Sequence, residues 1–142
     1  MTYGRRTLDY GLWADVVGVI HGLVVLFVVG GQALILAGWA AHWTWTRARV
    51  FRFAHLAAIG FIVAQQWLGR FCPLTVWESE LRRKAGVQGY EGGFIEYWLQ
   101  TLIYYSAPTW VFTLVYTLFG VVVAVSFVCY PPQKSRIRKR GI

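Results

Sequence analysis

Five polar residues interrupt the long apolar runs of this 142-residue chain: Asp15, His21, Gln66, Arg70 and Glu96. A charged side chain inside a membrane costs about 2.5–3.5 kcal/mol on insertion scales, so such residues usually pair with one another or serve a function. A carboxylate, an imidazole and a guanidinium in one network can move protons or bind the headgroup of a lipid or quinone. The same residues can also be a structural network that holds a small helix bundle together.

No residues match a known catalytic or metal-binding pattern. The sequence has no Gly-rich phosphate loop, no Ser-His-Asp set and no HExxH string. Its two cysteines, Cys72 and Cys129, do not form a CxxC pair, and Cys72 is more simply interpreted as a structural thiol than as a nucleophile. We therefore predict no catalytic residue and no metal site. The sequence requires no cofactor, and haem b or a quinone stays open as a ligand.

The histidines His21 and His55 are poor joint ligands for one haem. If the chain reverses direction near Trp45, His55 faces Ile35 and His21 faces Gly69. The two imidazoles then lie about 20 Å apart along the helix axes. One haem iron needs both ligands within about 2 Å.

Composition places these residues in a membrane protein. The chain is 57% hydrophobic and only 14% charged, whereas soluble domains carry about 25% charged residues. The formal net charge is +8, but the basic residues form short clusters between apolar runs, as in the loops of membrane proteins. We predict an all-α membrane protein that binds no nucleic acid.

The apolar runs predict a single transmembrane domain over residues 1–142, with spans at 12–40, 50–69, 93–107 and 109–130 and a basic tail at 131–142. Between the second and third spans, Thr75-x-x-Glu78 matches a capping box. It predicts a short amphipathic interfacial helix whose apolar side holds Val76, Trp77, Leu81 and Val87. The predicted fold is a four-helix transmembrane bundle with this helix at one end.

Small residues at helical spacing on two spans predict packing seams, because small side chains let helices approach closely. The seam residues are Gly11, Gly18, Gly22, Thr113, Thr117, Gly120 and Ala124.

Basic residues predict the topology. With four spans, eleven Lys and Arg fall on one side and three on the other. The positive-inside rule then makes both termini cytoplasmic. The tail residues that follow the last span attract anionic lipid, by about 1 kcal/mol per charge, or dock on a protein. They are Lys134, Arg136, Arg138, Lys139 and Arg140.

The sequence resembles the bacterial membrane proteins that carry domain of unknown function 2784. The resemblance rests on FCPLT at 71–75, Glu78, LRR at 81–83, AG at 85–86, GY at 89–90 and GGFIEY at 92–97, and extends to AD at 14–15, His21 and FAHL at 53–56. It covers about residues 10–130. It implies a small multi-span protein of the bacterial cytoplasmic (inner) membrane without an established activity. Two departures are Gln65-Gln66, where the family often has an acidic residue, and the basic tail.

Small size, small-residue seams and the lack of a catalytic signature favour a non-enzymatic accessory or assembly subunit of a larger membrane protein complex. Its partners are then membrane lipids and other membrane subunits. One alternative is a haem- or quinone-binding protein that handles electrons or protons. A small transporter is a further alternative, although four short helices leave little room for alternating access and no internal repeat is evident.

Overall fold

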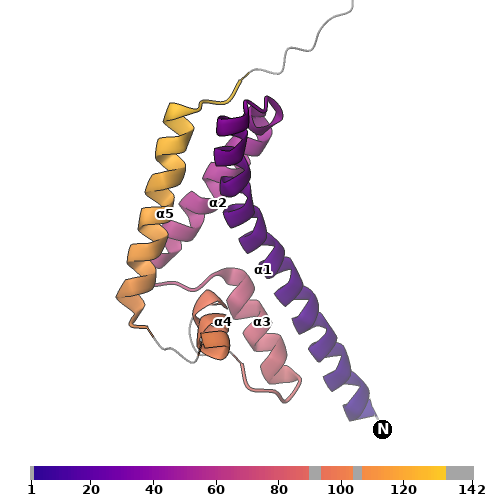
Figure 1. The fold of residues 1–142 in the computed structure, drawn as a ribbon. Helices are drawn as coiled ribbons and strands as arrows, with labels where there is room; N and C mark the ends of the chain where they lie inside the picture. Colours follow the sequence, from indigo (N-terminus) through magenta and orange to yellow (C-terminus); the bar gives the residue numbers. More distant parts are fainter. Residues whose placement is uncertain (1, 90–93, 104–106, 134–142) are drawn as a thin grey trace, which may run out of the picture.

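A computed structural model describes residues 2–89, 94–103 and 107–133. The regular secondary structure of these residues is helical (Figure 1). The elements are α1 (Thr2–Ala41), the 3-10 helix η1 (Trp45–Arg47), α2 (Arg49–Trp67), α3 (Pro73–Lys84), α4 (Phe94–Ile103) and α5 (Thr109–Cys129). The structure thus confirms the all-α class and the short helix after the second apolar run.

Prolines set the helix boundaries in the second half of the chain. Pro73 occupies the first turn of α3. A backbone N–H there has no acceptor within the helix, so its absence in proline costs no helical hydrogen bond. Pro108 directly precedes α5, and Pro131 follows the C-cap residue Tyr130. Residues 1–72 contain no proline, which is consistent with α1 running for 40 residues, about 60 Å.

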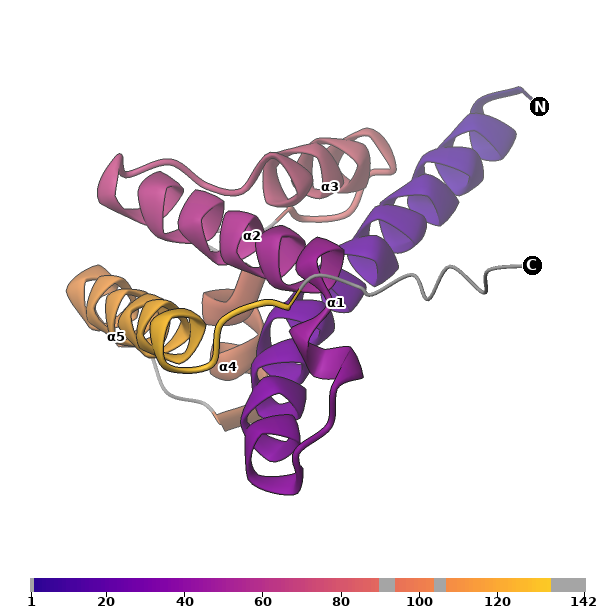
Figure 2. The ribbon, with the colours of Figure 1, turned by 90° about the horizontal axis from the view of Figure 1, so that it is seen from above.

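The long helix α1 is the element on which the others pack. One stripe of its residues is buried, at spacings of three, four and seven: Ala14, Val17, His21, Val28 and Ile35. The N-terminal half of this stripe contacts α3, and the C-terminal half contacts α2, η1 and α5 (Figures 1 and 2). A small apolar core of Val28, Ile59 and Val123 joins α1, α2 and α5.

The chain reverses direction at His42, three residues before the predicted apex. His42 has a φ of 59°, in the left-handed region that ends helices, and the Trp43 N–H donates to the Gly38 carbonyl at 2.8 Å. This early turn places His55 beside Val28, with 2.7 Å between Nε2 and the carbonyl oxygen. The prediction that His55 faces Ile35 is therefore wrong by about two helical turns.

Among the described residues, two helices are long and apolar enough to cross a membrane: α1, from Gly4, and α5. The four-span bundle is not confirmed. The predicted span at 93–107 contains the ten-residue helix α4, about 15 Å long, which is half of a 30 Å bilayer core.

The two described ends of the chain lie at opposite ends of the molecule, whereas the predicted four-span topology places both termini on one side of the membrane (Figure 1). The Gln133 N–H donates to the Arg47 carbonyl at 2.9 Å, next to the turn between α1 and α2. The start of α1 lies at the other end, beside α3. The predicted topology counts α4 as a full crossing of the bilayer, and it is not confirmed.

Candidate functional site

Glu78 is the centre of the contact between α1 and α3. Its side chain is fully buried, and its Oε1 accepts bonds from Arg82 Nη2 at 2.9 Å and Nε at 3.1 Å. Arg82 Nη2 also lies 3.5 Å from Asp15 Oδ1 on α1. Gly18 makes this approach feasible, because a Cβ there would stand 2.8 Å from Glu78 Oε1.

The imidazole of His21 lies in the same contact. It is buried, and its Nδ1 is 3.5 Å from Thr75 Oγ1 on α3. We call these five residues the acidic contact: Asp15, His21, Thr75, Glu78 and Arg82. It holds two carboxylates, one guanidinium and one imidazole, and of these groups the carboxylates and the imidazole can take up or release a proton.

The helix α3 packs on α1 with its polar face and leaves most of its predicted apolar side outward. It buries Thr75 and Glu78 against α1, while Val76 and Trp77 are more than half exposed. Thr75 does not cap the helix, so the capping-box prediction is wrong. The reason is Pro73, which begins α3 two residues earlier and leaves Cys72 as N-cap residue without a side-chain cap.

A second buried polar group lies at the other end of the molecule, where α2 begins and α5 ends. Arg52 is 2% exposed. Its Nη2 donates to the carbonyls of Ser126 at 2.9 Å and Tyr130 at 2.7 Å. These carbonyls lie in the last turn of α5 and just beyond it, where the helix leaves acceptors unpaired and carries a partial negative charge.

Gln32 of α1, Arg47 of η1 and Tyr130 complete this second group. Gln32 Nε2 donates to Ser126 Oγ at 3.1 Å, and the Tyr130 hydroxyl donates to the Trp43 carbonyl at 2.9 Å. Arg47 Nε donates to the Pro131 carbonyl at 2.9 Å, with its guanidinium 4.9 Å from the centre of the Tyr130 ring. We call this region the arginine end; it comprises residues 42–55 and 123–133 together with Gln32.

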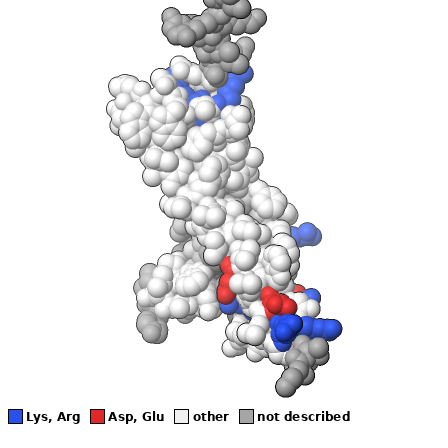
Figure 3. Space-filling model, turned by 90° about the vertical axis from the view of Figure 1, so that its right-hand side faces the viewer, with Lys and Arg blue, Asp and Glu red and all other residues white. Residues whose placement is uncertain are grey.

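Acidic side chains are unevenly distributed between these two regions (Figure 3). The described acidic residues lie on the N-terminal half of α1, on α3 and on α4: Asp9, Asp15, Glu78, Glu80 and Glu96. Residues 16–77 and 97–142 contain no Asp or Glu. The arginine end is therefore purely basic.

The residues of the predicted polar network lie in several separate parts of the structure. Asp15 and His21 lie in the acidic contact. Gln66 instead joins α2 to α5, with Nε2 donating to Thr113 Oγ1 at 3.1 Å. Arg70 is exposed after α2, and Glu96 lies partly buried on α4.

The predicted seams meet two different helices. On α1, Gly18 faces Glu78, and a Cβ at Gly11 would stand 4.0 Å from the Ala85 Cβ, whereas a Cβ at Gly22 would meet nothing within 4 Å. On α5, a Cβ at Gly120 would stand 3.0 Å from Val63 of α2.

Other seam residues of α5 also face α2. Thr117 Oγ1 accepts a bond from Trp67 Nε1 at 3.0 Å. Ala124, by contrast, is exposed. The tail residues lie outside the described residues: Lys134, Arg136, Arg138, Lys139 and Arg140.

Sequence reasoning missed the burial of Glu78 and Arg52 and the ion pair between Glu78 and Arg82. The signal available for the pair was the spacing of four residues, which is that of a helical ion pair. The signal available for Arg52 was its place on one helix face with His55, which is also buried.

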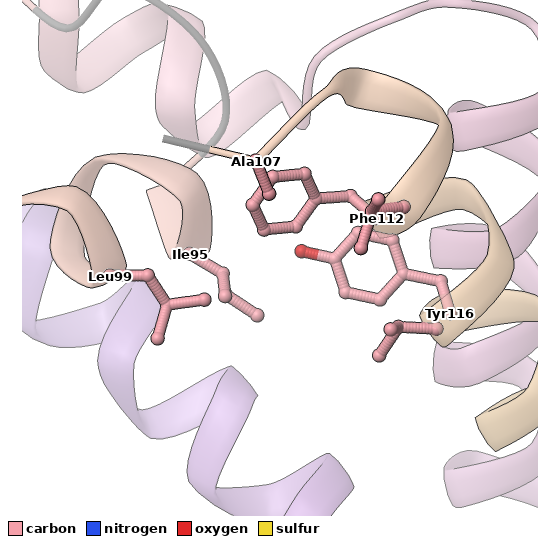
Figure 4. Close-up of a pocket in the computed structure, with 7 residues that line it drawn as sticks. Ile95, Leu99, Ala107, Phe112 and Tyr116 are labelled. Carbon is pink, nitrogen blue, oxygen red and sulfur yellow. The ribbon is translucent and has the colours of Figure 1, made fainter. Parts of the chain in front are cut away.

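An apolar cavity of about 250 Å³ lies between α4 and α5 (Figure 4). The Tyr116 hydroxyl points toward the α4 side of this cavity. The lining residues are Ile95, Leu99, Ala107, Val111, Phe112, Val115 and Tyr116. Among the described residues, no three His, Cys, Asp or Glu side chains gather in a way that could hold a metal ion.

Comparison with known proteins gives one match. Residues 11–132 match the family model described as Protein of Unknown function (DUF2784). No curated protein and no solved structure matches the chain. Because the match covers the acidic contact, the arginine end and every helix except the first turns of α1, the chain belongs to the DUF2784 family.

Proposed function

We propose that this protein is a non-enzymatic accessory or assembly subunit of a larger complex in the bacterial cytoplasmic membrane. The observation that carries the proposal is the N-terminal arm, formed by residues 2–21 of α1 together with α3. In this arm the charged side chain of Glu78 is buried between the two helices, and apolar side chains face outward. The exposed fractions are 75% for Leu8, 65% for Leu12, 59% for Trp13 and 58% for Trp77.

Helix lengths favour a protein partner for this arm. The 21 residues of α5 measure about 31 Å and suffice to cross the bilayer core. The 40 residues of α1 are nearly twice as long. Part of the arm therefore extends past the end of α5, to the headgroups or beyond (Figure 1). Exposed leucine and tryptophan at that level are best covered by another subunit.

The proposed topology has three crossings, by α1, α2 and α5. Two short helices, α3 and α4, then lie at the membrane surface on the side of the arm. With three crossings, eight Lys and Arg fall on the side of the arginine end and the tail, against six on the side of the arm. The positive-inside rule then makes the arginine end cytoplasmic.

Site-specific photo-crosslinking in native membranes tests the proposed subunit role. A photo-reactive residue at Leu12 is expected to capture one discrete protein, and gentle detergent is expected to extract that protein with the chain in fixed stoichiometry. Val122 on α5, 47% exposed, is the matched control and is expected to capture lipid. A monodisperse single chain, with lipid adducts only at both positions, would contradict the proposal.

A quinone-binding role is the second candidate, favoured by the cavity between α4 and α5. Its apolar lining suits an isoprenoid tail, and the Tyr116 hydroxyl is a donor for a quinone carbonyl. The test is solvent extraction of the purified protein. Quinone in the wild type and its loss in Tyr116→Phe would support this role, and extracts without quinone would remove it.

A further inference from the structure

Arg52 has unused hydrogen-bond donors. Its Nη2 donates to Ser126 and Tyr130, but its Nε and Nη1 are buried without a hydrogen-bond partner among the described residues. A guanidinium carries five N–H donors in a planar fork and stays charged at any physiological pH. Buried donors of this kind are nearly always satisfied by protein, water or ligand.

Among the described residues, Arg52 also has no acidic counter-ion. No Asp or Glu occurs in residues 16–77 or 97–142, which include α2, the helix that carries Arg52, and α5, the helix that its side chain contacts. The carbonyls at the end of α5 offer about half an elementary charge. Two rings, Phe127 at 5.4 Å and Tyr130 at 5.8 Å, add cation–π contact. Neither contribution is a full negative charge.

The surroundings of Arg52 indicate the depth of lipid headgroups. Trp43 and Trp45 are exposed and stack with their ring centres 6.1 Å apart, as in the aromatic belts of membrane proteins. Arg49 is exposed, and Arg47 is only partly buried. Three arginines thus occupy six consecutive positions at this depth.

We propose that Arg52 forms the floor of a phosphate site occupied by a lipid headgroup of net negative charge. Water could satisfy the Nε and Nη1 donors, but only an anion also balances the charge. The guanidinium fork matches the oxygens of a phosphate. Because Arg52 is 2% exposed, a covering side chain has to rotate to admit the phosphate, so bound lipid exchanges slowly.

Lipid binding by the full-length protein in neutral detergent tests this site. Native mass spectrometry compares phosphatidylglycerol with phosphatidylcholine, and thermal unfolding adds inorganic phosphate as a third arm. We expect one phosphatidylglycerol per chain to be retained, at least tenfold more than phosphatidylcholine, and to raise Tm. Arg52→Lys keeps the charge but loses the fork, and is expected to lower retention at least tenfold. Arg6→Gln, exposed at the opposite end, is the matched control and is expected to retain lipid like the wild type.

Three results would overturn the proposal. The first is equal retention of the two lipids by the wild type, a comparison that needs no variant and so decides the matter if Arg52→Lys does not fold. The second is wild-type retention by Arg52→Lys. The third is an equal rise in Tm with inorganic phosphate and with phosphatidylglycerol, which would assign the site to a free anion instead of a lipid.

Discussion

The acidic contact and the arginine end both bury charge against α1, but they neutralise it differently. In the acidic contact, Arg82 lies between the carboxylates of Glu78 and Asp15. At the arginine end, Arg52 meets the carbonyls that close α5 and two aromatic rings. In the first region a guanidinium of the chain pairs with the buried carboxylate, whereas the second relies on a helix end for part of the balance. A buried charge that the protein itself balances indicates a structural role. A buried charge that the protein balances only in part indicates a bound ligand.

Both regions depend on a glycine of α1. A Cβ at Gly18 would stand 2.8 Å from Glu78 Oε1, and a Cβ at Gly31 would stand 2.9 Å from His55 Cδ2. The helix thus admits a polar side chain of α3 in one half and of α2 in the other. Both contacts rely on a glycine of α1 for close approach, so the difference between them lies in how the buried charge is balanced.

The largest expected contrast between the two regions is their accessibility from the two sides of the membrane. Cys72 lies next to the start of α3, and Cys129 ends α5. In intact cells, a thiol reagent that cannot cross the membrane is expected to label Cys72 and not Cys129, with Cys129 labelled after permeabilisation. Single-cysteine variants, Cys72→Ser and Cys129→Ser, identify the labelled site. Labelling of both in intact cells would contradict the three-crossing topology.

Removing the buried carboxylate of the acidic contact is expected to give the largest loss of stability. Glu78→Ala removes the buried carboxylate that Arg82 binds at 2.9 Å, and breaking a buried ion pair costs about 3–5 kcal/mol. Because the Arg82 side chain is 27% exposed, we expect a loss near the lower value, about 3 kcal/mol in the free energy of unfolding. Glu80→Ala, whose carboxylate is exposed on the same helix, is the control and is expected to cost less than 1 kcal/mol. Equal losses for the two variants would show that burial of Glu78 does not matter.

A smaller loss is expected when a methyl group is added at the glycine contacts. Gly18→Ala and Gly31→Ala force a neighbouring side chain to move, at a cost of about 1–3 kcal/mol each. Gly22→Ala is the matched control because nothing lies within 4 Å of its added Cβ, and it is expected to be neutral or to stabilise by up to about 1 kcal/mol. Thermal or denaturant unfolding of the three variants measures the order. A loss at Gly22 equal to that at Gly18 would rule out the close approach as the cause.

The smallest expected effect is the loss of one hydrogen bond at the arginine end. Ser126→Ala removes the bond from Gln32 but keeps the backbone carbonyl that Arg52 uses. Hydrogen bonds between membrane helices average about 0.6 kcal/mol, and we expect that loss in the free energy of unfolding. Thr113→Val, which removes the bond from Gln66, is expected to cost the same. A loss of several kcal/mol at Ser126 alone would mean that its hydroxyl supports the position of Arg52.

Sequence patterns predicted the helices well because prolines and apolar runs are local signals. The run at 109–130 corresponds to α5, and the short helix after the second run corresponds to α3. Hydrophobic periodicity identified the apolar side of this helix but not the face that packs on α1. That buried face is polar and holds Thr75 and Glu78.

The candidate site was predicted only in part. His21 was singled out because it interrupts an apolar run, and it is buried. Its partners on α3 are more than 50 residues away in the sequence, and no local pattern links them. The grouping with Gln66 and Arg70 rested on a chain reversal near Trp45, and the backbone of His42 moved that reversal by three residues.

The continuity of α1 has a mechanical consequence. Within the described residues, neither a break nor a proline separates the end that packs on α2 from the end that carries α3. A rigid rod of the roughly 20 residues in the arm is about 30 Å long. A change of about 10° in the angle of α1 at the core would therefore displace its far tip by about 5 Å. In such a movement α1 would pivot at its contact with the core residues Val28 and Ile59, and Leu8 and Leu12 would lie on the moving end.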